Sequence, residues 1–293
     1  LLISLIFIPL AFGQDFNLKS QLKSIPQVKK IKKLKNVDHF EEYYEFWFEQ
    51  HTDPKDPNSP TFYQRCYIGH SDVDKPLIIE LQGYNIYTRK AGELASQFSA
   101  NQLTIEHRYF DPSSPKKGID WATLTVDNAA HDQHLIIQAF HKIYPNSKFL
   151  TTGISKGGQT TMIHRSKYPN DVDASVCYVA PLVFEREDSR IYTFLDTVGT
   201  DDQRARVKDF QLMCLQNEKV LMPTFDSLAT ANKWSWKFDR KTAYHYYILE
   251  YSFAYWQWGG KEFNKIPTEK DSELAIVLHL LRISGLSFFE QKG

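Results

Sequence analysis

The chain has 293 residues, of which 42% are hydrophobic and 24% charged, and its 35 Lys and Arg balance its 35 Asp and Glu. This neutral, globular composition gives no electrostatic reason to expect nucleic acid or an anionic membrane as a partner. The chain has three cysteines, Cys66, Cys177 and Cys214. This small, odd number argues against a disulfide framework. Cys177 lies in an apolar run, so we expect it to be a small buried residue.

The N-terminal residues 1–13, LLISLIFIPLAFG, are typical of the apolar region and cleavage site of a secretory signal peptide. They are too few to span a bilayer, which takes about 20 residues. We therefore expect a partial signal peptide and a protein that is secreted or periplasmic, with no membrane contact after cleavage. Residues 14–39 are rich in lysine, and we interpret them as a basic, solvated arm, either a surface helix or a mobile segment.

Residues 41–50 and 61–70 are aromatic-rich and flank a Pro-rich stretch, which predicts two antiparallel strands. Four apolar runs predict buried strands: 76–82, 103–107, 148–152 and 174–179. A helix is predicted over 127–144, starting at Asp127 and Asn128, because Leu135, Ile136, Ala139, Phe140 and Ile143 recur at three and four residues. Alternating strands and helices indicate an α/β core with a parallel sheet, which we place at residues 40–186.

The strand signal ends at about residue 185. Helices are predicted over 191–195, 202–217, 242–258 and 272–284, the last stopped by Gly285. Residues 187–293 are therefore expected to form a helical block.

Residues 153–157 read Gly-Ile-Ser-Lys-Gly, between a predicted strand and a helix-like stretch. This is the context of the nucleophile elbow, in which a serine sits on a sharp turn from strand to helix. We predict that Ser155 is a nucleophile. An acyl-transfer site also needs donors for the oxyanion, and we expect the backbone N–H groups of Lys156 and Tyr84 to supply them.

Several spaced motifs resemble one family. They are 106–110 (EHRYF), 132–134 (DQH), 153–158 (GISKGG), 168–173 (YPNDVD), 180–181 (AP) and 254–257 (AYWQ). From about Tyr43 to Gly293 the chain resembles the PS-10/S37 family of secreted serine peptidases. The resemblance implies an α/β-hydrolase fold with a helical lid insertion. It also implies an enzyme that acts on peptides and removes short peptides from their free N-termini, often after proline. On this resemblance Ser155 is the nucleophile, and no cofactor is expected.

Other residues have two interpretations each. Tyr255, Trp256 and Trp258 would wall the substrate pocket or form the core of the lid. Glu106 would bind a substrate ammonium group or pair with Arg108. A further pair, His131 and His134, has metal-ligand spacing but lacks a third ligand, so no metal site is predicted.

The rest of the triad is not evident. In α/β-hydrolases the acid and the histidine follow the serine in the chain, and His164, His245 and His279 all fall in helical patterns. We expect the triad acid, the histidine and the last core strands to lie beyond residue 293, and this chain alone to be inactive. The alternatives are an esterase or lipase with the same elbow, and a non-catalytic binding protein on the same fold.

Overall fold

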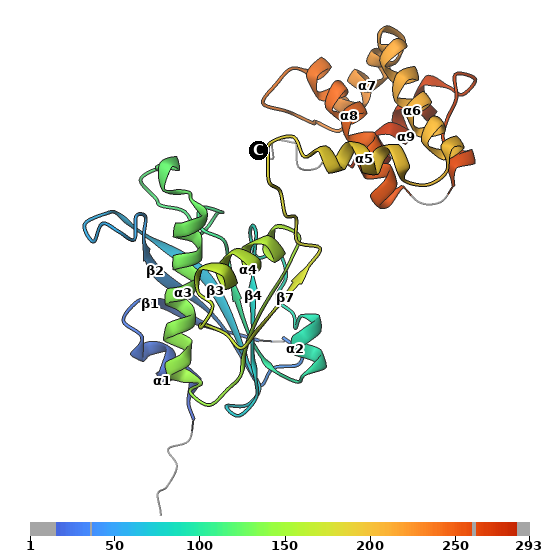
Figure 1. Ribbon diagram of the computed structural model, residues 1–293. Helices are drawn as coiled ribbons and strands as arrows, with labels where there is room; N and C mark the ends of the chain where they lie inside the picture. Colours follow the sequence, from blue (N-terminus) through green and yellow to red (C-terminus); the bar gives the residue numbers. More distant parts are fainter. Residues whose placement is uncertain (1–15, 36, 260–261, 286–293) are drawn as a thin grey trace, which may run out of the picture. The chain divides into compact units, whose positions relative to one another are not determined.

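The computed structural model describes residues 16–35, 37–259 and 262–285 (Figure 1). The chain divides into two compact units, one up to Val183 and one from Phe184 onward. We call them the sheet unit and the helical unit. The division falls close to the boundary predicted between residues 186 and 187. The predicted signal peptide, residues 1–13, lies outside the described residues.

Within the described residues the sheet unit contains one seven-stranded sheet in the order β1-β2-β3-β5-β4-β6-β7. The strands are β1 (Val28–Leu34), β2 (Glu42–His51), β3 (Thr61–His70), β4 (Leu77–Leu81), β5 (Asn101–Ile105), β6 (Phe149–Ile154) and β7 (Ala174–Tyr178). The predicted antiparallel pair is β2 and β3, and β4 to β7 are mutually parallel. The α/β-hydrolase class expected from the sequence is confirmed, with a mixed sheet that is parallel around β4 and β6.

Helices cover both faces of this sheet. The helices of the sheet unit are α1 (Leu18–Ser24), α2 (Glu93–Gln97), α3 (Val126–Ile143) and α4 (Lys156–Lys167), with a 3₁₀ turn at Trp121–Thr123. Leu77 and Ile79 of β4 pack in one cluster with α1 and α3, whereas Ile78 packs with α2. Because successive side chains of a strand point to opposite faces, α2 lies across the sheet from α1 and α3 (Figure 1).

The lysine-rich N-terminal segment is not a separate arm, which corrects the expectation for residues 14–39. It forms α1 and the edge strand β1, which pairs antiparallel with β2. Leu18, Leu22 and Val28 are buried in the main core, and this apolar face was hidden in the sequence among the lysines. The lysines of β1 point mainly outward, and a register shift interrupts the pairing between Lys29 and Lys32. Charge and irregularity both protect an edge strand from pairing with another chain.

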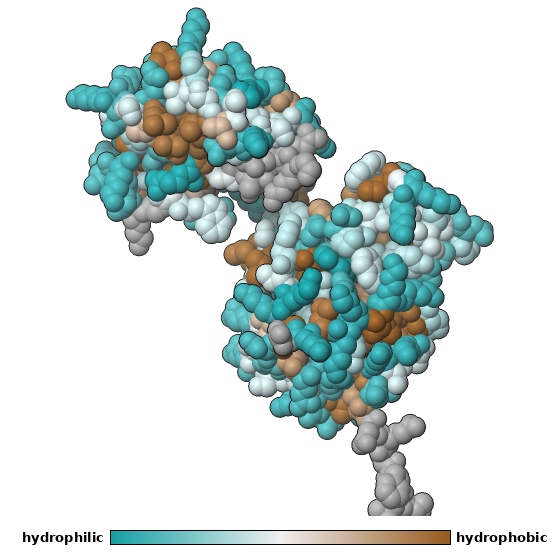
Figure 2. Space-filling model, turned by 180° about the vertical axis from the view of Figure 1, so that it is seen from behind, coloured by the Kyte–Doolittle hydropathy of each residue, from teal (hydrophilic) through white to brown (hydrophobic). Residues whose placement is uncertain are grey.

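Two smaller expectations are wrong. The α3 helix is capped by Thr125, whose hydroxyl accepts from the Asn128 N–H at 3.1 Å, rather than starting at Asp127. Cys177 is exposed rather than buried, because β7 is an outer strand among the described ones. On the face shown in Figure 2, the surface of each unit is mostly polar and carries scattered apolar patches.

The helical unit contains five helices among the described residues, with a 3₁₀ turn at Phe263–Lys265. They are α5 (Ser189–Thr197), α6 (Asp201–Gln216), α7 (Glu218–Ala231), α8 (Arg240–Trp258) and α9 (Glu273–Ser284). Gly285 ends α9 in the left-handed conformation, as predicted. The sequence did not predict α7, because Pro223 lies inside it. Among the described residues, no helix combines the length and the apolar character needed to cross a bilayer.

Candidate active site

Ser155 occupies the turn between β6 and α4 with φ 56° and ψ −122°. A side-chain-bearing residue adopts this region only under strain. Two backbone hydrogen bonds hold the turn: the Ser155 N–H donates to Tyr178 O at 3.0 Å, and the Gln159 N–H donates to Ser155 O at 3.0 Å. The side chain is exposed. The predicted elbow is therefore present, with its hydroxyl open to a reactant.

The loop after β4 packs directly against this elbow. A Cβ atom on Gly83 would lie 2.7 Å from the Gly157 nitrogen, and one on Gly157 would lie 2.6 Å from the Leu81 carbonyl oxygen. No side chain fits at such distances, so both positions require glycine. The structure thus brings the loop that carries Tyr84, the residue predicted to supply the second oxyanion donor, next to the turn that carries Ser155.

Both predicted oxyanion donors are available. Within the described part of the chain, neither the Lys156 N–H nor the Tyr84 N–H has an acceptor. Lys156 is the first residue of α4, and the opening N–H groups of a helix point outward along its axis without intrahelical partners. Such free backbone amides are the groups that stabilise a developing oxyanion.

Polar contacts hold the loop that carries Tyr84. The Tyr84 carbonyl accepts from the His107 N–H at 3.2 Å, and the Asn85 side-chain amide donates to Asp111 O at 2.5 Å. The Ile86 N–H donates to Glu106 at 2.9 Å. Residues 84–86 therefore each have a defined partner, which gives the loop a fixed shape before any substrate arrives.

Glu106 has a structural role as the molecule stands. Its side chain is fully buried, and its carboxylate accepts from Arg65, Ser113 and the Ile86 N–H. The position therefore has no surface open to a substrate ammonium group, and its ionic partner is Arg65 rather than the expected Arg108. The carboxylate acts on the site indirectly, because it anchors the loop that carries Tyr84.

Arg108 pairs instead with Asp132 of α3. Two bonds of 2.6 and 2.8 Å join the guanidinium to the carboxylate, and both side chains are buried. Arg108 also donates to the carbonyls of Thr52 and Thr123. Burial raises the pKa of Asp132 to about 6, and the bonds from Arg108 oppose that shift. This bidentate pair ties the segment that follows β5 to α3 in the interior of the sheet unit.

The histidines after Ser155 bind elsewhere. His164 contacts Asp171 at 3.1 Å, His245 contacts Glu218 at 2.6 Å, and His279 contacts the Tyr251 hydroxyl at 2.9 Å. In the part of the chain that the structure describes, no base or acid contacts the Ser155 hydroxyl. The expectation that the other triad members lie beyond residue 293 remains a prediction.

The His131 and His134 pair has protein partners. His131 contacts the Tyr168 hydroxyl at 3.0 Å, and His134 contacts Asp171 at 2.8 Å and stacks on the Tyr168 ring. The described residues contain no group of three side chains placed to hold a metal ion.

In the helical unit, Tyr255 is a core residue. It is buried and contacts the rings of Tyr251, Trp256 and Phe263. Trp256 is half-buried against the same cluster, whereas Trp258 is exposed. The alternative interpretation, a core residue of the helical unit, fits the burial of Tyr255. Its burial follows from its position on the same face of α8 as Tyr244, Tyr247, Ile248 and Tyr251.

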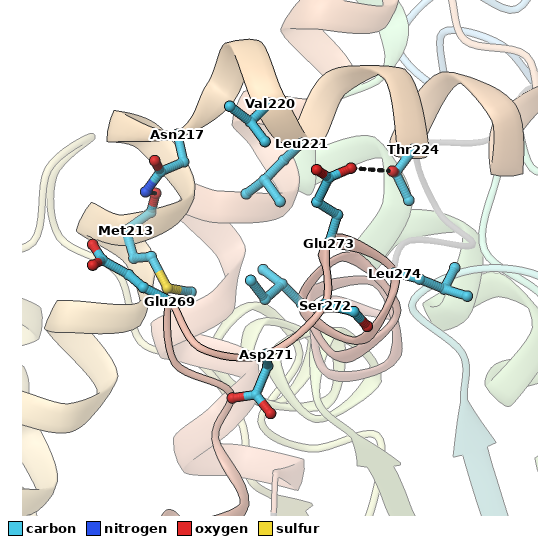
Figure 3. A pocket seen from close by; sticks show the side chains of 11 residues that line it. Met213, Asn217, Val220, Leu221, Thr224, Glu269, Asp271, Ser272, Glu273 and Leu274 are labelled. Atoms are coloured by element: carbon cyan, nitrogen blue, oxygen red, sulfur yellow. Dashed lines mark hydrogen bonds between the residues drawn. The ribbon is translucent and has the colours of Figure 1, made fainter.

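A separate pocket of about 640 Å³ opens within the helical unit (Figure 3). Its walls include Met213, Leu221 and Leu274, and its charged groups are the carboxylates of Glu269, Asp271 and Glu273. Glu273 accepts a hydrogen bond from the Thr224 hydroxyl at 3.3 Å. The sequence did not predict this pocket, because its lining comes from α6, α7, the segment before α9 and the start of α9 together.

Comparisons with known proteins agree with the elbow. The family model of the PS-10 peptidase S37 family matches residues 11–293. The chain belongs to this family. It is 31% identical over 251 residues to a prolyl tri/tetrapeptidyl aminopeptidase of Streptomyces mobaraensis, covering 84% of this chain and 52% of the relative. The chain thus spans about half the length of this curated relative.

Solved structures that resemble the chain include two hydrolases. Acetyl xylan esterase 1 from Thermoanaerobacterium sp. is 14% identical with a TM-score of 0.38, covering 61% of this chain and 65% of the esterase. Dipeptidyl peptidase 4 of Porphyromonas gingivalis is 12% identical with a TM-score of 0.33, covering 51% of this chain and 27% of the peptidase. At these TM-scores the two likenesses carry no weight for function.

Proposed function

We propose that the chain is the nucleophile-bearing part of a secreted or periplasmic serine peptidase that releases short peptides from free N-termini, with a preference for proline. The conformation of Ser155 carries this proposal. A strained, exposed serine between a parallel strand and a helix, with two unengaged amides beside it, suits acyl transfer. Membership of the S37 family and the name of the Streptomyces relative support peptide rather than ester substrates.

In the proposed reaction, the Ser155 Oγ attacks the scissile carbonyl carbon and loses its proton to a histidine that acts as general base. The carbonyl oxygen becomes an oxyanion between the N–H groups of Lys156 and Tyr84. Collapse of this intermediate breaks the C–N bond, and the amine leaves with the proton from the histidine. Water then hydrolyses the acyl-enzyme and frees Ser155.

The surface beside the serine suits apolar substrate groups. Ile154, directly before Ser155, is 66% exposed. Val179 is 80% exposed and directly follows Tyr178, whose carbonyl accepts from the Ser155 N–H. These two side chains are compatible with proline or another apolar residue of a peptide.

The test is labelling of the full-length protein by a fluorophosphonate, with the Ser155→Ala variant as control. We expect labelling of the unsubstituted protein only, followed by faster hydrolysis of proline-containing peptides with a free N-terminus than of blocked peptides or simple esters. Absence of labelling in the folded full-length protein would refute the nucleophile. Residues 1–293 alone are expected to hydrolyse none of these substrates, since an unassisted serine is a weak nucleophile.

A further inference from the structure

The side chain of Lys156 folds back over the loop after β4. Its ammonium nitrogen donates to the Gly83 carbonyl at 2.7 Å. The same nitrogen lies 4.7 Å from the ring centroid of Tyr84 and 4.8 Å from that of Phe110. These two rings meet edge to face at 5.4 Å. The ammonium therefore occupies a cage made of one carbonyl oxygen and two aromatic rings.

This arrangement is costly for a lysine and so requires compensation. Holding a long side chain in one conformation costs up to about 2 kcal/mol of rotamer entropy, and burial lowers the pKa of Lys156. No carboxylate lies within ion-pair distance of it among the described residues. Its charge is satisfied by the Gly83 carbonyl and by cation–π contact.

The Gly83 carbonyl belongs to the same peptide group as the Tyr84 N–H. A peptide group is planar and trans, so its carbonyl and its N–H point in opposite directions. A donor that fixes the Gly83 oxygen therefore also fixes the direction of the Tyr84 N–H. The charged Lys156 ammonium that donates to this oxygen polarises the peptide group and makes the Tyr84 N–H a stronger donor.

The same contact restricts rotation of the peptide group between Gly83 and Tyr84. The following peptide group is held by the bond from the His107 N–H to the Tyr84 carbonyl. The preceding residue, Gly83, lacks a Cβ and permits rotation of the peptide group that carries the donor. The bond from Lys156 opposes that rotation.

Building on the proposed function, we infer that the Lys156 side chain is a positioning group for the oxyanion hole. One residue then serves both donors: its own N–H is the first, and its ammonium orients and polarises the second. The side chain itself touches no reacting atom. It acts through the peptide group between Gly83 and Tyr84.

The test compares Lys156→Met with Lys167→Met in the full-length protein. Methionine keeps most of the apolar stem and the backbone N–H but removes the charge. Lys167 lies on the same helix and pairs at the surface with Asp127, so it is a matched control. Loss of a whole oxyanion donor lowers kcat by about 10²–10³. For partial loss we expect kcat of Lys156→Met to fall about 10- to 100-fold with KM within about threefold, and the control to stay within about twofold.

A second measurement separates positioning from general damage. A peptide aldehyde forms a tetrahedral adduct with the serine and uses the oxyanion hole, whereas a product peptide does not. We expect Lys156→Met to weaken aldehyde binding by the same factor as kcat and to leave product binding unchanged. If the methionine variant fails to fold, the same comparison of aldehyde and product binding is made with Lys156→Gln, whose side chain is shorter and uncharged.

An unchanged kcat and unchanged aldehyde binding would overturn the inference, and so would equal losses of aldehyde and product binding. If the unsubstituted protein is labelled and hydrolyses peptides while the Lys156 variants behave normally, the inference alone fails. If the unsubstituted protein is neither labelled nor active, the proposed function fails and the inference fails with it.

Discussion

The strain at Ser155 predicts that two inactive variants differ in stability. Ser155→Ala keeps a Cβ and therefore keeps the strained backbone at φ 56° and ψ −122°. Ser155→Gly removes the Cβ, and glycine adopts positive φ without steric cost. We expect Ser155→Gly to be more stable than Ser155→Ala, although glycine at most other positions would be less stable.

The size of this difference follows from two opposing terms. A residue held in a sparsely populated backbone region costs about 1–3 kcal/mol. Glycine gives up about 0.5–1 kcal/mol through the greater freedom of the unfolded chain. Because the Ser155 hydroxyl has no hydrogen-bond partner among the described residues, neither variant loses such a bond there, and the net difference is about 1 kcal/mol in favour of glycine. In a unit of this size that corresponds to about 2–4 °C.

Urea unfolding resolved by hydrogen exchange of peptides from the sheet unit measures this difference. Ser96→Gly in α2 is the matched control, because Ser96 is exposed and helical in the same unit. We expect the control to lose about 0.5–1 kcal/mol relative to Ser96→Ala. A Ser155→Gly variant that is less stable than Ser155→Ala would refute the strained elbow, and with it the main structural support for Ser155 as nucleophile.

Two further predictions concern buried charged and titratable groups. Arg108→Met should destabilise the sheet unit by about 3–5 kcal/mol in urea unfolding, because it leaves the Asp132 carboxylate buried and unpaired. The double variant Arg108→Met with Asp132→Leu should recover part of that loss. A double variant that is no more stable than Arg108→Met alone contradicts the prediction. Burial, with smaller effects of nearby cations, lowers the pKa of both His107 and His279 to about 4. A histidine in the unfolded chain titrates near 6.5. Each unit should therefore have its full stability above pH 6.5 and lose up to about 3 kcal/mol as the pH falls toward 4, because only the unfolded state binds the proton in that range. The prediction is contradicted if the unfolding free energy of a unit does not change between pH 6.5 and 4. It is also contradicted if His107→Asn or His279→Asn leaves the pH dependence of its own unit unchanged.

The elbow could be predicted from the sequence because its determinants are local. An apolar strand, two glycines around a serine and a following helix all lie within residues 148–167. Most strands were predictable for the same reason, since the apolar runs match β4 to β7 in place. The edge strand β1 was missed because its lysines outnumber its apolar residues, and α7 because an internal proline argues against a helix.

The supports of the site could not be found in this way, since they join residues far apart in the chain. Lys156 binds a carbonyl 73 positions earlier, and Glu106 pairs with an arginine 41 positions earlier. These contacts depend on strand order. Because β4 lies beside β6 and parallel to it, the loop after β4 and the elbow after β6 emerge at the same edge of the sheet. A lysine that directly follows the elbow is thereby brought within reach of that loop. A prediction of the β4–β6 pairing would therefore have placed the lysine of the GISKGG motif beside the loop that carries Tyr84.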